Sequence, residues 1–143
     1  MIVVALILVL LMILGPFVQR ARRDAQVKKA EGQVQMLAAA IRTLAWDTGK
    51  WPGGLDRSTT QTTATWDLTT PAAGLLSADS RFSNWKGAYI QDVPLDPWNN
   101  PFFFDPAYRV NGTNRVVVGS FGPNGVGRNA YDADNIYVFL DDE

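Results

Sequence analysis

The first eighteen residues of the chain, Met1 to Val18, contain no charged side chain. A stretch of this length comes close to the about 20 apolar residues that an α-helix needs to cross a bilayer. The Gly15-Pro16 pair interrupts it, and because proline removes a backbone hydrogen bond, we expect a kink or local melting of the helix there. No charge precedes the stretch and a poor cleavage site follows it, so a cleaved export signal is not favoured. The chain must therefore bury this segment in lipid or against other protein.

Residues 19–47 are predicted to continue as an amphipathic helix. They contain no proline, and apolar residues recur at helical spacing. The apolar face comprises Val27, Ala30, Val34, Leu37, Ala38, Ile41, Leu44 and Ala45, and the opposite face carries Arg23, Lys28, Lys29, Glu31, Gln35 and Arg42. Gly49 suits a helix C-cap and Pro52 prevents continuation, so we expect the helix to end just before them. A helix that is continuous from Met1 would be roughly 70 Å long at about 1.5 Å per residue.

The remaining residues, 48–143, are predicted to form a globular body of loop and sheet. Residues 53–82 are rich in Gly, Ser and Thr and are expected to form a long surface loop. Phe102–Phe104 is predicted to be a short strand, and "NGTN" at 111–114 is typical of a hairpin turn before a second strand, "RVVVGSFG". Alternating apolar residues in "NIYVFLDD" predict a last strand. Because the apolar helix face is the natural partner of this antiparallel sheet, the predicted fold class is α+β.

The composition excludes several classes of site. The chain has no cysteine and no histidine, which removes thiolate nucleophiles and zinc sites built on these residues. No nucleophile is accompanied by a base, so we do not expect an enzyme. Residues 1–31 carry five basic and two acidic side chains, whereas residues 32–143 carry eight and twelve. This net-acidic body argues against nucleic acid as a partner, because phosphate binding requires clustered cations.

Several segments together resemble a known family. They are the apolar start with Pro16, "LAWDTGKWP" at the end of the helix, "WKGAYIQDVPLDPWNNPFFF" with its Asp-Pro-Trp segment, and the glycine-rich loop "SFGPNGVGRNAYDADNI". On these residues the chain resembles the major pseudopilins of type II secretion systems, members of the type IV pilin-like superfamily. The resemblance implies a pilin-like fold, in which a long N-terminal helix packs on a small antiparallel sheet with a long αβ loop. It further implies a structural subunit of a helical pseudopilus, which assembles through its N-terminal helix and drives protein export across the outer membrane.

The resemblance also implies a location and partners. Residues 1–18 would form a stem in the bacterial cytoplasmic (inner) membrane, with the body in the periplasm, until the subunits stack into a periplasmic or cell-surface filament. The stem residues are Leu6, Leu10, Leu14, Gly15, Pro16 and Val18. The implied partners are further copies of the chain, minor pseudopilins, the inner-membrane assembly platform and, before assembly, the membrane.

One departure from the family concerns the N-terminus. After a leader is cut off, family members begin with a methylated phenylalanine and carry a glutamate a few residues later. Neither is found in the apolar run of this chain. Aligning Pro16 with the proline of the family suggests that a handful of residues is absent here.

The loop before the last strand holds candidate calcium ligands. Asn124, Asp132 and Asp134 offer hard oxygens in a glycine-rich loop, and such oxygens suit Ca²⁺. An EF-hand frame fails, because apolar Ile136 and bulky Tyr137 occupy positions that need an oxygen ligand and a glycine. By resemblance, one calcium ion binds here to Asp132 and Asp134, with Asn124 replacing an aspartate. The backbone carbonyl of Phe121 would complete the set. The alternative is that these polar residues only shape turns.

Other patterns favour structural roles. Asp92 and Asp96 are close enough in sequence to suggest a carboxylate pair, but the prolines beside them favour turn capping. Trp85, Tyr89 and Trp98 could stack on sugars or on a partner, although packing within the body is favoured.

Two other functions stay open at this stage. The chain could be a subunit of a type IV-like surface pilus or extracellular fibre. It could also be a monomeric membrane-anchored binding module whose helix is a plain stalk.

Overall fold

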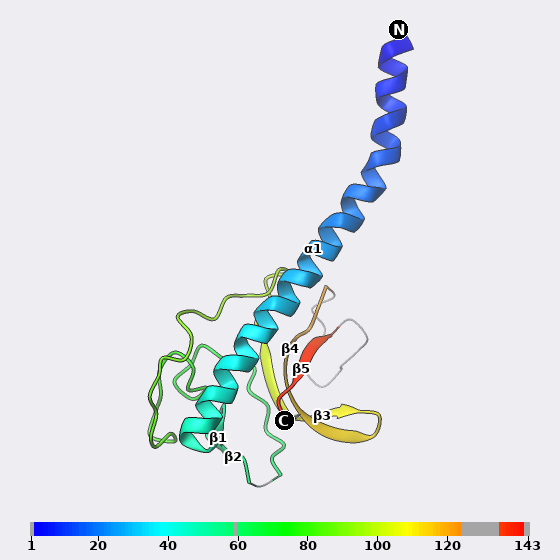
Figure 1. Cartoon of the computed structure of the whole chain (residues 1–143). Coiled ribbons are helices and arrows are strands. Elements are labelled where there is room, and N and C mark those ends of the chain that lie inside the picture. The colour runs from blue at the N-terminus through cyan, green and yellow to red at the C-terminus, as the bar shows by residue number, and fades with distance from the viewer. Residues whose placement is uncertain (1, 59, 124–134, 142–143) are drawn as a thin grey trace.

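A computed structural model describes residues 2–58, 60–123 and 135–141, and for residues 2–20 it describes the backbone alone. The chain forms one long helix, α1 (Ile2–Thr48), and five strands. The strands are β1 (Lys50–Trp51), β2 (Leu55–Asp56), β3 (Phe103–Val110), β4 (Thr113–Ser120) and β5 (Ile136–Phe139). The body gathers around the C-terminal half of α1, and the N-terminal half projects away from it (Figure 1).

Helix α1 is continuous over 47 residues. It runs through Gly15 and Pro16, so the local melting predicted there is wrong. The ribbon instead curves between its projecting end and the body (Figure 1). A helix can accommodate a proline, which lacks the N–H for one backbone hydrogen bond, by bending rather than by melting. The predicted end is confirmed: Gly49 has a φ of 71°, and its N–H donates to the Ala45 carbonyl at 2.9 Å. This is the left-handed C-cap that glycine adopts without strain.

The three-stranded sheet has the order β3-β4-β5 and is antiparallel throughout. Asn111 and Gly112, with φ of 51° and 80°, form the tight turn that pairs Val110 with Thr113, which confirms the predicted hairpin. Strand β3 is longer than the predicted Phe102–Phe104. It continues past Pro106 because the register shifts between Asp105 and Tyr108, and this bulge accommodates a residue that cannot donate to the ladder.

The segment 53–82 is not only a surface loop. It contributes β2, which pairs with β1, and Thr65 forms an isolated bridge to Phe104 through two backbone hydrogen bonds of 2.7 and 2.8 Å. Its apolar side chains Leu68, Ala73, Leu75 and Phe82 are buried in the core. The predicted surface loop is wrong at these residues, because the short sheet leaves part of the apolar helix face uncovered and the loop fills that space.

The main core lies between α1 and the sheet. Seven of the eight residues predicted for the apolar helix face are buried there: Ala30, Val34, Leu37, Ala38, Ile41, Leu44 and Ala45. Val27, one turn before them, is only partly buried. In the last strand, Ile136 and Val138 pack towards this core, whereas Tyr137 and Phe139 join a second aromatic cluster around Phe103 on the other face of the sheet. The alternation predicted for the last strand is therefore confirmed.

Candidate assembly surface

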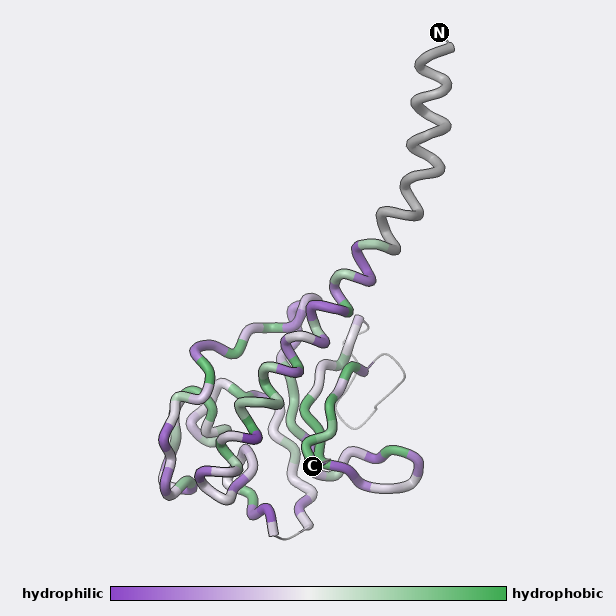
Figure 2. Tube along the Cα trace, viewed as in Figure 1, coloured by the Kyte–Doolittle hydropathy of each residue, from purple (hydrophilic) through white to green (hydrophobic). Residues whose placement is uncertain are grey.

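Helix α1 has two parts that differ in what surrounds them. From Ala30 onward one face is buried under the body. Residues 21–29 are exposed on all sides apart from the partly buried Val27. Figure 2 shows hydrophilic residues on this projecting part, where α1 has left the body. A helix exposed in this way gains no stability from its own domain, and most helical stability in proteins comes from packing. The projecting part is therefore the first candidate surface for contact with other molecules.

The predicted stem belongs to this projecting part. The backbone of residues 2–18 is helical, and it lies at the end of α1 that is farthest from the body (Figure 1). The side chains of Leu6, Leu10, Leu14, Pro16 and Val18 lie outside the described residues. Over the described residues, no helix has both the length and the apolar character that crossing a membrane requires.

A second candidate surface lies on the body-covered half of α1, and the sequence reasoning did not find it. Met36, Ala39, Ala40 and Thr43 form one wall of a hollow of about 300 Å³, and Tyr89 and Ile90 form the other. We call this hollow the outer groove. The apolar residues of its wall occur on the face of α1 that the sequence marked as polar. The occurrence of apolar residues on a face predicted to be polar was the sequence signal that could have indicated this groove.

The second wall of the outer groove is fixed to α1 at two points. The Tyr89 hydroxyl donates to Asp47 at 2.9 Å, and the Gln33 amide donates to the Leu95 carbonyl at 3.4 Å. Segment 89–95 therefore runs antiparallel to α1. Burial and the neighbouring Asp47 carboxylate raise the pKa of Tyr89, so its hydroxyl stays protonated and keeps donating at neutral pH. Packing roles are confirmed for two of the aromatic residues, since Trp85 donates to the Gly74 carbonyl at 2.7 Å and packs edge-on against Tyr89.

Arg42 holds the last strand against the helix. Its guanidinium donates to the Phe139 carbonyl at 2.8 Å, and the side chain is partly buried. The prediction that placed Arg42 on the solvent face is wrong. Arg42 lies beside the apolar face of α1, next to the edge of the sheet. There a long side chain can bury its methylene groups and still reach a backbone carbonyl.

The end of β5 is fixed by an ion pair on the other face of the sheet. Arg115 binds the Asp141 carboxylate through two nitrogens, at 2.9 and 3.1 Å, and its guanidinium carbon lies 4.1 Å from the centre of the Phe139 ring. Partial burial disfavours ionised Asp141, but hydrogen bonds from Arg115 and the Val116 N–H, together with the charge of Arg115, outweigh burial. The pKa of Asp141 is therefore lowered.

The Asp-Pro-Trp segment is organised by a buried carboxylate. Asp96 accepts the backbone N–H groups of Trp98 and Asn100 at 3.0 and 2.8 Å, and the Ser120 hydroxyl at 2.6 Å. Asp92 is exposed. The turn-capping interpretation of Asp96 is confirmed. This network also joins the segment to the end of β4, where the glycine-rich loop begins.

The four predicted calcium ligands are described only in part. Phe121 follows β4 directly, and its side chain is buried in the aromatic cluster with Phe103. Asn124, Asp132 and Asp134 lie outside the described residues. Elsewhere in the described chain, no group of three or more acidic side chains could hold a metal ion.

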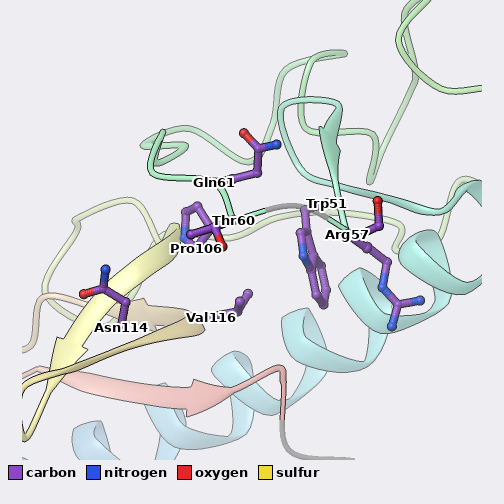
Figure 3. A pocket seen from close by; sticks show the side chains of 8 residues that line it. Trp51, Arg57, Thr60, Gln61, Pro106, Asn114 and Val116 are labelled. Carbon is purple, nitrogen blue, oxygen red and sulfur yellow. The ribbon is translucent and has the colours of Figure 1, made fainter.

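A polar hollow of about 270 Å³ lies where α1 ends. Trp51 and Arg57 line one side, Thr60 and Gln61 come from the loop, and Pro106, Asn114 and Val116 come from β3 and β4 (Figure 3). Arg57 lies over the Trp51 ring at 5.2 Å and donates to the Ala45 carbonyl at 3.3 Å. A cation beside the last turn of a helix interacts favourably with the carbonyls and the negative end of the helix dipole there. Arg57 therefore anchors the helix end.

Comparison with known proteins places this arrangement among secretion proteins. The family described as type II secretion system (T2SS), protein G, matches residues 18–137. The chain is 32% identical over 139 residues to the type II secretion system core protein G of Xanthomonas campestris pv. campestris, covering 95% of this chain and 82% of that protein. Its fold is similar to the crystal structure of the major pseudopilin from the type 2 secretion system of enterohaemorrhagic Escherichia coli. The TM-score is 0.56 at 19% identity, covering 82% of this chain and 85% of that one. The predicted pilin-like α+β fold is confirmed.

The lowered pKa of Asp141 predicts a pH-dependent contribution to stability. Because folding depresses the pKa, the ion pair stabilises the folded state above the unfolded pKa of about 3.9, and this contribution is lost as the pH falls through the folded value. For a partly exposed pair it amounts to about 0.2–1 kcal/mol. We expect Asp141→Asn to lower the free energy of unfolding at pH 7 and to approach the wild type near pH 3. Denaturant titrations across this range measure it, with Asp92→Asn, an exposed carboxylate, as the control. A wild type whose advantage persists unchanged at pH 3 would contradict this account.

Proposed function

The chain belongs to the family of type II secretion system protein G, and we propose that it is a structural subunit of a pseudopilus, a filament built from many copies of the chain. The family matches most of its length, residues 18–137. The resemblance read from the sequence is thereby confirmed. We propose that the filament drives proteins across the outer membrane.

The observation that carries this proposal is the division of α1. The body covers the helix from Ala30 to Thr48, while the preceding residues of the same helix extend beyond it. That projecting part spans about 40 Å at 1.5 Å per residue. It has no partner within the described chain, and neighbouring copies in a filament would supply one. Apolar contacts between stems would then replace contacts with lipid.

We propose no catalytic role for this protein. A filament subunit needs none, and Arg57, the charged residue of the hollow in Figure 3, holds the end of α1. The network of Asp96 and Ser120 likewise serves to fix a turn.

The location and partners follow from the same proposal. Before assembly, the apolar residues 1–18 lie in the cytoplasmic membrane and the body lies in the periplasm. Further copies, minor pseudopilins and an assembly platform in the inner membrane are the expected partners. The absence of charged side chains from residues 1–18 supports the proposed membrane location, because a charged side chain at the centre of a bilayer is costly.

Electron microscopy of sheared membranes tests the proposal. Cells that produce the chain with its natural leader and a working assembly machinery should yield thin, uniform fibres that contain it. Leu10→Arg should abolish them, because a charge in an apolar contact costs several kcal/mol. Thr113→Arg, an exposed position on the β3–β4 hairpin, is the matched control and should leave them intact.

Dispersed membrane-bound monomers, in cells whose machinery assembles another subunit, would overturn the proposal. They would instead support a membrane-anchored module. If fibres form, a secretion assay separates the two filament functions. Loss of export with Leu10→Arg identifies a pseudopilus, whereas normal export with lost surface fibres identifies a surface pilus.

We also propose that the loop after β4 binds one calcium ion. Phe121, Asn124, Asp132 and Asp134 would supply backbone, amide and carboxylate oxygens, which are the donors that Ca²⁺ prefers. The start of the loop supports this, since the Gly122 N–H donates to Ser120 at 3.1 Å and Ser120 donates to Asp96. The carbonyl of Phe121 is thus carried on a fixed backbone. A bound ion would stabilise the loop, and the neutral Asn124 should weaken the affinity.

Thermal unfolding tests the calcium proposal. A ligand that binds only the folded state raises the melting temperature, here by roughly 3–10 °C at saturating calcium. Asp134→Ala should remove this rise, and Asp92→Ala should keep it. Identical melting of the wild type in calcium and in chelator would show that the site is absent.

A further inference from the structure

The large apolar side chains that are exposed in the described chain are Met36, Trp46 and Leu95, with 53%, 80% and 53% of their surface accessible. Met36 lines the outer groove. Leu95 and Trp46 lie beyond its lining: the Leu95 carbonyl accepts the Gln33 amide at one end of segment 89–95, and Trp46 follows Thr43 by one helical turn. Scattered exposed apolar residues are ordinary, but a gathering along one flank of a helix marks an interaction surface.

The shape of the outer groove fits another helix. It runs along α1, and three of the four residues of its α1 wall are small: Ala39, Ala40 and Thr43. Small residues let a second helix approach closely, while larger side chains at the rim fit beside it. The groove is open to solvent along this flank of α1, so a partner can enter from the side.

The charges around the outer groove indicate which helix binds there. Asp92 is exposed two residues after Ile90, and the partly buried Asp47 accepts the Tyr89 hydroxyl. Residues 21–29 of α1 expose Arg22, Arg23, Lys28 and Lys29 against one acid, Asp24. The same segment carries Ala21 and Ala25, small residues that can pack closely against the α1 wall of the groove. An arginine in it could also lie over the exposed ring of Trp46, the aromatic side chain that attracts cations most strongly.

We propose that the outer groove binds the basic segment 21–29 of a second copy of this chain. The inference rests on the proposed filament function and assigns one contact within it. The segment cannot come from the same chain, because α1 is a single continuous helix and residues 21–29 cannot fold back onto residues 36–46. Each copy therefore offers a groove to one neighbour and a basic segment to another. A head-to-tail contact of this kind builds open filaments.

Site-specific photo-crosslinking in the full chain tests the contact. Ala39 is replaced by p-benzoylphenylalanine, and cells that assemble fibres are irradiated. Covalent dimers are then digested, and the joined peptides are identified by mass spectrometry. Thr113→p-benzoylphenylalanine is the control, because the β3–β4 hairpin extends away from α1 (Figure 1). Fibres from each variant are counted by electron microscopy before irradiation.

We expect dimers from position 39 whose cross-link lies within residues 21–29, and no such link from position 113. Fibres without dimers, links to another part of the body, or links to a different protein would overturn the groove contact while leaving the filament function intact. Absence of fibres in the wild type would instead overturn the proposed function, and the contact with it.

A positive charge placed in the groove gives an independent measurement. Ala39→Arg should reduce the yield of fibres by about tenfold, the effect of losing one strong interface contact, because the new cation would face the cations of segment 21–29. The exposed site should leave the melting temperature unchanged. Thr113→Arg should change neither quantity. Full fibre yield from Ala39→Arg would contradict the inference, and unchanged melting ensures that a low yield does not reflect misfolding.

Discussion

The structure depends on one contact, the burial of a single face of α1 under a sheet too small to bury itself. A single layer of three strands leaves its apolar face open to solvent, and a helix that covers this face completes the core. The residues from Ala30 to Ala45 provide that area, with about 1.5–3 kcal/mol for each large side chain that is fully buried. The loop residues Leu68 and Leu75 fill what the sheet leaves open. Because β1, β4 and β5 all contact α1, the orientation of the helix fixes the orientation of the body.

The polar contacts secure this arrangement at its ends. Arg57 binds the last turn of α1, Arg42 binds the Phe139 carbonyl on β5, and Arg115 holds Asp141 at the end of the same strand. The body is therefore held on the helix from residue 30 to its C-cap, and α1 leaves it as one continuous, curved helix. Contacts made on the projecting part act on the same helix that carries the body. This property suits a subunit whose stem sits inside a filament and whose body sits outside.

Sequence patterns predicted the elements whose causes are local. The spacing of Val34, Leu37 and Ile41 is set by the helical repeat, and the turn at Asn111-Gly112 by the left-handed backbone that these residues tolerate.

Features that depend on distant partners were either not predicted or predicted wrongly. Leu68 and Leu75 have no periodic neighbours that would mark them as core, and Arg42 is partly buried only because β5 ends beside it. In the outer groove, the apolar Met36 lies on α1, but the sequence does not show that Tyr89 and Ile90 form the opposite wall. Of the predicted calcium ligands, Phe121 alone is among the described residues, so that site stays a prediction.

The central claim is that the body stabilises only one half of α1 and leaves the other half for neighbours. Amide hydrogen exchange on the full chain, dispersed in detergent, tests it most directly. Opening of residues 34–48 would break the core, whereas opening of residues 21–29 would expose no apolar contact. The account predicts that the amides of residues 34–48 exchange at least about a hundredfold more slowly than those of residues 21–29. Equal protection of the two segments in the dispersed chain would contradict it, because the projecting half would then be stable without any neighbour.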